Sequence, residues 1–164
     1  MSAQFGDGAS LWGRPRAFEA IVYGGLVVGV LDGLAATTHF GLRDGTPLRL
    51  FQYVASGLLG AASYNGGWLS FLLGVLVHFF IAFVAAAVYY RASLSFPVLI
   101  RRAVLCGMIY GVAVFFFMSR IVVPLSATRK IPFSFTQMLI GLMIHILFIG
   151  LPIALLARRS ARAH

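Results

Sequence analysis

Charged side chains are scarce in this sequence: they make up 10% of its 164 residues, and only four of them are acidic. Hydrophobic residues account for 60%, and the mean hydropathy is +0.94. A soluble domain of this size could not bury so much apolar surface and would need more charge outside. The composition therefore excludes an ordinary soluble domain and indicates an integral membrane protein.

Cysteine is nearly absent as well. The single cysteine, Cys106, lies inside an apolar run, so an intrachain disulfide is excluded. Cys-x-x-Cys and Cys/His zinc spacings are missing, no serine has a Ser–His–acid context, and no Gly-rich phosphate loop follows a strand. The sequence therefore gives no sign of an enzyme. A cleavable signal peptide is not expected, because the first apolar run is too long for one.

The basic residues are distributed in a way that argues against nucleic-acid binding. The net charge is +9, but the Lys and Arg residues stand at the ends of apolar runs, where they meet lipid head groups. We therefore expect the lipid bilayer, and no nucleic acid, as the partner of these charges. A homo-oligomer or a larger membrane complex is also expected, because four helices alone leave little room for a pore.

Four apolar runs are long enough to cross a membrane. A helix needs about 20 apolar residues to cross a hydrocarbon core of roughly 30 Å, and unpaired backbone groups are excluded from lipid. The predicted spans are residues 18–40, 68–90, 103–123 and 133–157. The predicted fold is an all-α membrane protein with a single four-helix transmembrane domain over residues 18–157. A flexible cytoplasmic tail is expected at 1–17 and a basic cytoplasmic tail at 158–164.

The positions of the basic residues predict the orientation of the spans. Eight lie on one side of the predicted membrane, namely Arg14, Arg16, Arg91, Arg101, Arg102, Arg158, Arg159 and Arg162. Four lie on the other side, namely Arg43, Arg49, Arg129 and Lys130, and Arg120 is near the end of a span. Since Lys and Arg are enriched in cytoplasmic segments, both termini are expected in the cytoplasm of a bacterial cell, with the spans in its inner membrane.

A shorter apolar segment, residues 46–63, lies between the first two spans. Thr46 suits a helix cap, Pro47 a first turn and Gly60 a helix end. One face is mostly apolar and the other carries Arg49, Gln52, Tyr53 and Ser56. This pattern predicts either an interfacial amphipathic helix on the periplasmic side or a re-entrant half-helix, which would favour a pore.

The two halves of the chain resemble each other. Leu73-Gly74-Val75-Leu76-Val77-His78 matches Ile140-Gly141-Leu142-Met143-Ile144-His145, and an Arg follows thirteen residues after each His. Two spans per half would give repeats of the same orientation, related by an axis along the membrane normal. The sequence predicts an internal repeat of two helical hairpins; chance similarity between apolar runs is the alternative.

Small residues recur at helical spacing in the first and third spans. Gly25, Gly29 and Gly33 share one face of the first span, and Gly107 and Gly111 one face of the third. Such faces let helices approach closely in lipid, so we expect these two spans to pack on each other through their glycines.

Polar residues within the spans are the candidates for function. Asp32 and His39 follow the glycine face of the first span, and a carboxylate at this depth faces a protein interior, a partner or a water-filled cavity. Arg120 is a candidate partner for Asp32; alternatively its side chain extends outward to the interface.

His78 and His145 are the most specific feature. Each lies about eleven residues from the outer end of its span, which places both near the bilayer midplane. Two imidazoles at one level could ligate a haem b, with Gly74 and Gly141 leaving room for the macrocycle, or hold a transition metal. They could also relay protons or ions together with Asp32 and His39. The structural alternative is that each ring donates to a neighbouring helix.

Several stretches resemble a group of four-span bacterial inner-membrane proteins and, loosely, the YagU-like small membrane proteins. These stretches are Val30-Leu31-Asp32-Gly33, Ser56-Gly57-Leu58-Leu59-Gly60, Gly66-Gly67-Trp68, His78-Phe79-Phe80-Ile81-Ala82-Phe83 and Pro124-Leu125-Ser126. The resemblance implies the fold and the membrane but no activity.

Three functions remain open: a channel, transporter or transport accessory; a haem- or metal-binding redox subunit; and a non-catalytic assembly or lipid-organising protein.

Overall fold

Helices make up most of the chain in the computed structural model, which describes residues 17–43, 45–129 and 134–162. The α-helices are α2 (Gly24–Gly41), α3 (Pro47–Leu59), α4 (Gly67–Ser95), α5 (Val98–Arg101), α6 (Ala103–Phe117), α7 (Val123–Leu125), α8 (Phe135–Ile144) and α9 (Leu151–Arg162). Wider π-helical turns cover Glu19–Tyr23, Met118–Val122 and His145–Gly150, and a 3₁₀ helix covers Gly60–Asn65. The expected tail at 1–17 lies almost wholly outside the described residues.

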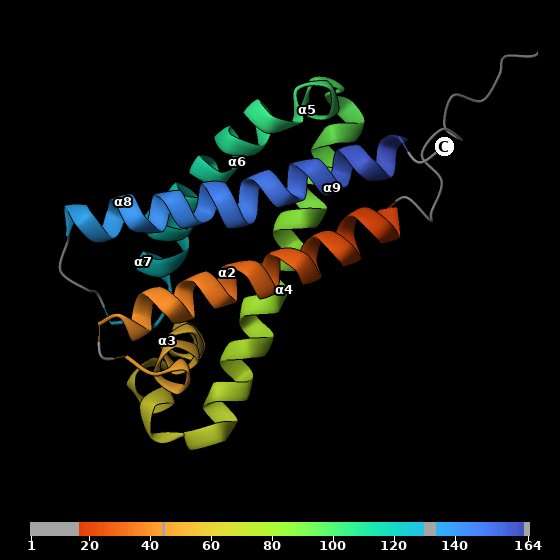
Figure 1. The fold of residues 1–164 in the computed structure, drawn as a ribbon. Helices are drawn as coiled ribbons and strands as arrows, with labels where there is room; N and C mark the ends of the chain where they lie inside the picture. The colour runs from red at the N-terminus through yellow and green to blue at the C-terminus, as the bar shows by residue number, and fades with distance from the viewer. Residues whose placement is uncertain (1–16, 44, 130–133, 163–164) are drawn as a thin grey trace, which may run out of the picture.

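Four continuous helices are long and apolar enough to cross a membrane within the described ranges. They are Glu19–Gly41, Gly67–Ser95, Ala103–Leu125 and Phe135–Arg162. The second of these is α4 alone, and each of the other three unites α and π segments named above. The prediction of an all-α protein with four spans and one shorter helix is therefore confirmed. In Figure 1, α2 and the α8–α9 helix run beside each other in opposite directions, and α4 crosses them steeply.

The bundle has small side chains inside and large apolar side chains outside. Its core consists mainly of alanines, among them Ala86, Ala103 and Ala154, with Tyr89 the largest fully buried side chain. Leucines such as Leu69 and Leu76 are more than half exposed on the outer surface. Lipid tails are as apolar as leucine, so close packing of small residues holds such helices together.

Two tyrosines donate hydrogen bonds from the second and third spans to backbone carbonyls of neighbouring helices. The hydroxyl of Tyr89 on α4 donates to the carbonyl of Leu99 at 2.9 Å, and that of Tyr110 on α6 donates to Ala85 at 2.8 Å. The two rings also meet edge to face, with centroids 5.0 Å apart. These two side-chain hydrogen bonds add to the packing of α4 against α5 and α6.

Replacement of Tyr89 by Phe tests this link. The variant leaves the Leu99 carbonyl without its donor, and we expect the free energy of unfolding to fall by about 1 kcal/mol. Thermal unfolding in detergent micelles measures the change. Tyr23→Phe is the matched control, because the Tyr23 side chain is 56% exposed. Equal thermal unfolding midpoints for Tyr89→Phe and Tyr23→Phe would show that the Tyr89–Leu99 hydrogen bond does not stabilise the bundle.

The glycine face of α2 contacts the second span, which corrects the expectation that it packs on the third. A methyl group at Gly25 would overlap the ring of Phe83, and one at Gly29 would lie 2.5 Å from the ring of Phe79. At Gly33 it would lie 3.2 Å from the imidazole Nε2 of His78. The spacing of four residues therefore admits side chains of α4, one turn after another. Spacing identified the small face but could not identify the helix that it meets.

The glycines of the third span contact the fourth span. A Cβ at Gly107 would lie 2.8 Å from that of Ala154, and one at Gly111 would lie 2.6 Å from the carbonyl oxygen of His145. Gly150 completes the contact, since a Cβ there would overlap the Gly107 carbonyl and lie 2.5 Å from the amide nitrogen of Gly111. Here the two backbones, rather than side chains, lie against each other.

Helix α3 buries two polar side chains together with part of its apolar face. Thr46 caps it by accepting from the amide of Arg49 at 3.3 Å, as predicted, and Gly60 ends it with a φ of 60°. Gln52 and Ser56 are each only 1% exposed and Ala55 is fully buried, whereas Leu58 is 64% exposed. The Gln52 amide donates to the carbonyl of Gly67 at 3.2 Å and to the hydroxyl of Ser70 at 3.3 Å. Polar anchors at the start of α4 therefore help to orient α3.

The two prolines of the described spans follow π-helical turns. Pro124 is the second residue after the Met118–Val122 segment, and Pro152 the second after His145–Gly150. Proline has no N–H and its ring crowds the carbonyl four residues earlier, so a wider turn lets the helix continue. The fourth span continues past Pro152 to Arg162, whereas the third span ends at Leu125, one residue after Pro124.

Candidate functional site

A cavity of about 420 Å³ lies inside the bundle and receives side chains from all four spans and from α3. Most of its lining is apolar, with Val28 from α2, Ile81 from α4 and Val114 from α6 as examples. Asp32, His78 and His145 also line it. We call it the central cavity. The structure thus brings three of the four predicted polar residues to one cavity, although they are distant in sequence.

Asp32 and His78 form an ion-pair contact across the interface of α2 and α4. The carboxylate Oδ2 lies 4.0 Å from the imidazole Nδ1, and the side chains are only 16% and 13% exposed. The other ring nitrogen, Nε2, lies 2.8 Å from the carbonyl oxygen of Gly29. Because a carbonyl only accepts, Nε2 carries the hydrogen and Nδ1 is the nitrogen that faces Asp32. Phe51 and Phe79 contact the ring edge to face and help fix its plane.

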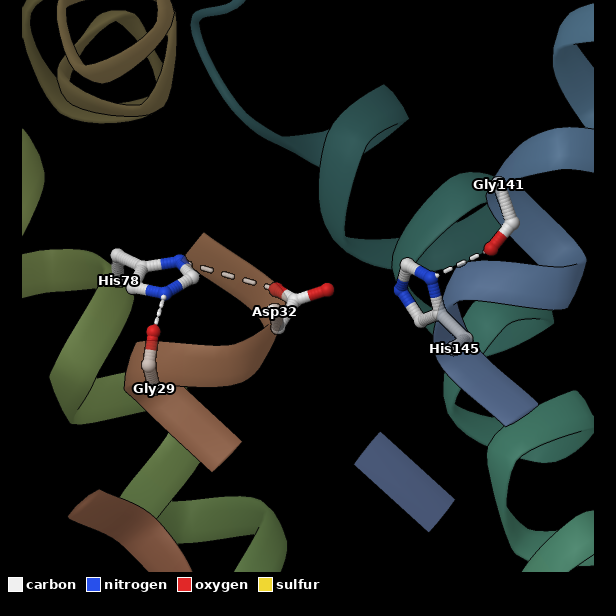
Figure 2. A network of polar contacts seen from close by, with 5 residues as sticks. All are labelled: Gly29, Asp32, His78, Gly141 and His145. Atoms are coloured by element: carbon white, nitrogen blue, oxygen red, sulfur yellow. Dashed lines mark hydrogen bonds and ion pairs between the residues drawn. The ribbon is translucent and has the colours of Figure 1, made fainter. Parts of the chain in front are cut away.

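His145 lies on the other side of the same carboxylate. Its Nδ1 lies 2.9 Å from the carbonyl oxygen of Gly141 and donates to it, so Nε2 is the nitrogen that can accept a proton. Figure 2 shows Asp32 between the two rings, with one carboxylate oxygen towards His78 and the other towards His145. His145 also begins the π-helical turn before Pro152, the kind of widened turn that is frequent at functional sites.

His39 and Arg120 lie away from this cluster. The Nε2 atom of His39 is 2.7 Å from the side-chain oxygen of Gln137 on α8, so His39 joins the first span to the fourth. Arg120 is exposed and has no ion pair with Asp32, whose ion-pair partner among the described residues is His78. The alternative of an Asp32–Arg120 pair is therefore wrong.

The room expected for a haem macrocycle beside Gly74 and Gly141 is occupied by other parts of the protein. At Gly74 a Cβ would overlap the backbone carbonyl of Phe51, and at Gly141 it would lie 3.0 Å from the ring of Phe115. These glycines admit α3 and a phenylalanine, respectively, rather than a flat macrocycle. Within the described ranges, no group of three or more His, Cys, Asp or Glu side chains is placed to hold a metal ion.

Sequence reasoning missed the two buried polar anchors of α3 and the glycine at the centre of the closest helix contact. The amphipathic pattern of residues 46–63 puts Gln52 on the polar face, and Ser70 carries no pattern that distinguishes it from its neighbours. Gly150 lies four residues before Ala154, and this small-xxx-small spacing is the signal that could have pointed to it.

The fold and the polar cluster define the class: a multi-pass membrane protein with a four-span helical bundle and a cavity between its helices. No protein-family model, no curated protein and no solved structure matches the chain. The four-span architecture that the YagU-like resemblance implied is thus observed, and kinship with that group stays a prediction.

Proposed function

We propose that this protein is a small transporter, or an accessory of one, that moves protons or a proton-coupled solute through the central cavity. The observation that carries the proposal is the position of Asp32 between His78 and His145. Ionisable groups at this depth in a membrane are costly and usually mark an ion or proton pathway. A mostly apolar cavity of a few hundred Å³ with few polar groups is also the usual form of a small-molecule site.

The tautomers of the two histidines suit proton transfer through Asp32. When His78 is protonated, its Nδ1–H can give the proton to the carboxylate, leaving a neutral imidazole and a carboxylic acid. The acid can then give that proton to Nε2 of His145, leaving a carboxylate and an imidazolium. One proton moves in each step, and no electrons are exchanged. The 4.0 Å between Asp32 and His78 exceeds hydrogen-bond length, so transfer needs a small rotation of the carboxylate.

The redox alternative has less support than transport. Haem-ligating histidines commonly use Nε2, and in His78 this atom is engaged by the Gly29 carbonyl. The steric room expected beside Gly74 is filled by the backbone of α3. The cluster fits proton exchange without a cofactor better than it fits axial ligation of haem b.

Proton flux into liposomes tests the proposal. The full-length protein is reconstituted with a pH-sensitive dye inside, and a potassium diffusion potential drives protons inward. We expect Asp32→Asn to lower the protein-dependent rate by about tenfold, in the range of losing a positioned proton carrier. His39→Asn, in the same span but outside the lining of the central cavity, is the control and should keep a rate within about twofold.

Two results would count against a pathway through Asp32. One is a wild-type rate equal to that of protein-free liposomes, and the other is an unchanged rate in Asp32→Asn. Either would favour the third function, a non-catalytic assembly or lipid-organising role that needs no titratable group.

We also propose that the protein lies in the inner membrane with both termini in the cytoplasm. The two ends of the described bundle, at the start of the first span and the end of α9, lie on the same side in Figure 1. Arginines gather at that end, namely Arg91, Arg101, Arg102, Arg158, Arg159 and Arg162. The positive-inside rule makes it the cytoplasmic end.

The proposal also keeps three expectations from the sequence. They are a single transmembrane domain over residues 18–157, the repeat of two hairpins, and assembly with a second copy or a larger membrane complex.

A further inference from the structure

A second pocket lies at the end of the bundle opposite the arginine-rich end. It has a volume of about 630 Å³ and lies where the first and third spans end and α8 begins. Its polar lining includes Arg43, Arg120, Tyr53, Ser134 and Gln137. We call it the arginine pocket. Nothing in the transport proposal uses these residues.

The described residues that line the arginine pocket do not compensate its charge. Arg43 comes from the segment after α2 and Arg120 from the π-helical turn of the third span, yet both reach one pocket. No carboxylate is among the lining residues of the part of the chain that the structure describes, and neither arginine is ion-paired with any residue of that part. Two guanidinium groups in one concave site favour an anion with several oxygens, which arginine binds through paired hydrogen bonds.

Neutral donors complement the two arginines. Burial raises the pKa of Tyr53, with a smaller contribution from Tyr64, so its hydroxyl keeps its proton at neutral pH and can donate to an anion. Ser134 precedes the ten-residue helix α8, and its side chain makes no capping hydrogen bond. The leading N–H groups of that helix add partial positive charge at the same place.

The arginine pocket adjoins the central cavity. Tyr53, Phe115 and Ser119 line both spaces, so a molecule bound between the arginines can extend past these side chains. The arginine pocket supplies positive charge, and the central cavity beyond it is lined mainly by apolar side chains. Together they have the polarity of an amphiphile, with a charged head at one end and an apolar body at the other.

We propose that the arginine pocket binds the carboxylate or phosphate head of an amphiphilic anion whose apolar part extends into the central cavity. Binding itself does not require transport; only the identification of this anion as the transported molecule rests on the proposed function. The head group could belong to a free amphiphile or to an anionic phospholipid of the surrounding membrane, and both share this chemistry.

Binding of dodecyl phosphate to the full-length protein in detergent micelles tests the proposal. The comparison probes are inorganic phosphate, which has the head without the tail, and dodecyltrimethylammonium, which has the tail with the opposite charge. We expect dodecyl phosphate to bind at least about tenfold more tightly than either probe. Arg43→Gln and Arg120→Gln should each weaken it by about tenfold, the effect of losing one charge-assisted hydrogen bond.

The control variant is Arg91→Gln, an exposed arginine at the other end of the bundle, which should leave the affinity unchanged. If inorganic phosphate bound as tightly as dodecyl phosphate, the pocket would be a phosphate site, and the proposal of an amphiphilic ligand would be wrong. Equal binding of the cationic probe, or unchanged affinity in both pocket variants, would overturn the arginine site altogether.

Two further comparisons distinguish a membrane lipid from a free amphiphile as the ligand, and the binding proposal from the transport proposal. In nanodiscs, loss of dodecyl phosphate binding when phosphatidylglycerol is added to phosphatidylcholine would identify a membrane lipid as the competing occupant and support the anionic head-group site. Retained binding would support a free amphiphile. Because binding is measured without a proton gradient, a failed binding test leaves the Asp32 flux test intact, and a failed flux test leaves the binding result intact.

Discussion

Replacement of Gly150 by Ala is expected to destabilise the contact between the third and fourth spans. The new Cβ would overlap the Gly107 carbonyl and lie 2.8 Å from the Gly111 Cα, so the backbones of two helices would have to separate. Overpacking against atoms that cannot change rotamer costs up to about 3 kcal/mol, and the better helix propensity of alanine offsets about 1 kcal/mol of this. We expect a net loss of about 2 kcal/mol and a fall of roughly 6 °C in the thermal midpoint in detergent.

Gly141→Ala is the matched control for this prediction. It adds the same methyl group to the same span and gains the same helix propensity, but its Cβ meets the side chain of Phe115, 3.0 Å away, which can rotate aside. We expect its midpoint to equal or exceed that of the wild type. If both variants lost the same stability, the cause would be the loss of glycine in the fourth span rather than the contact with Gly107 and Gly111.

Replacement of Gly74 by Ala is expected to displace α3 from α4. The Cβ would overlap the carbonyl of Phe51 and lie 2.6 Å from its carbonyl carbon, so the new methyl group meets helix backbone. The cost is again about 2 kcal/mol, concentrated on one short helix. Hydrogen exchange should therefore speed up by about tenfold or more in the amides of α3, while the core of the spans stays protected.

Gly57→Ala serves as the control on α3. Its Cβ would lie 3.6 Å from the Thr128 hydroxyl oxygen and 3.7 Å from the Ser126 Cβ, which are ordinary contact distances. Exchange in α3 should remain at or below the wild-type rate. Unchanged exchange in Gly74→Ala would show that α3 is held by the Gln52 and Ser70 hydrogen bonds alone, and that its close approach to α4 contributes little.

The sequence determined the local features of this protein because they depend on length, composition and nearby residues. The four spans follow from apolar runs that must form hydrogen-bonded helices in lipid. The cap of α3 follows from Thr46 and Pro47, whose effect reaches only a few residues along the chain. The depth of His78 and His145 follows from the helical rise, so the sequence alone could predict that these two share a level.

Only the tertiary structure decided which faces meet, because periodicity describes one helix and says nothing about its partner. Gly25 and Gly29 meet aromatic rings of the second span, and the glycines of the third span meet the backbone at Gly150. Helix α3 buries Gln52 because carbonyl and hydroxyl acceptors lie at the start of α4, a fact that its own amphipathic pattern cannot contain. The central cavity likewise exists only once five helices surround it, and that arrangement places Asp32 between two imidazoles.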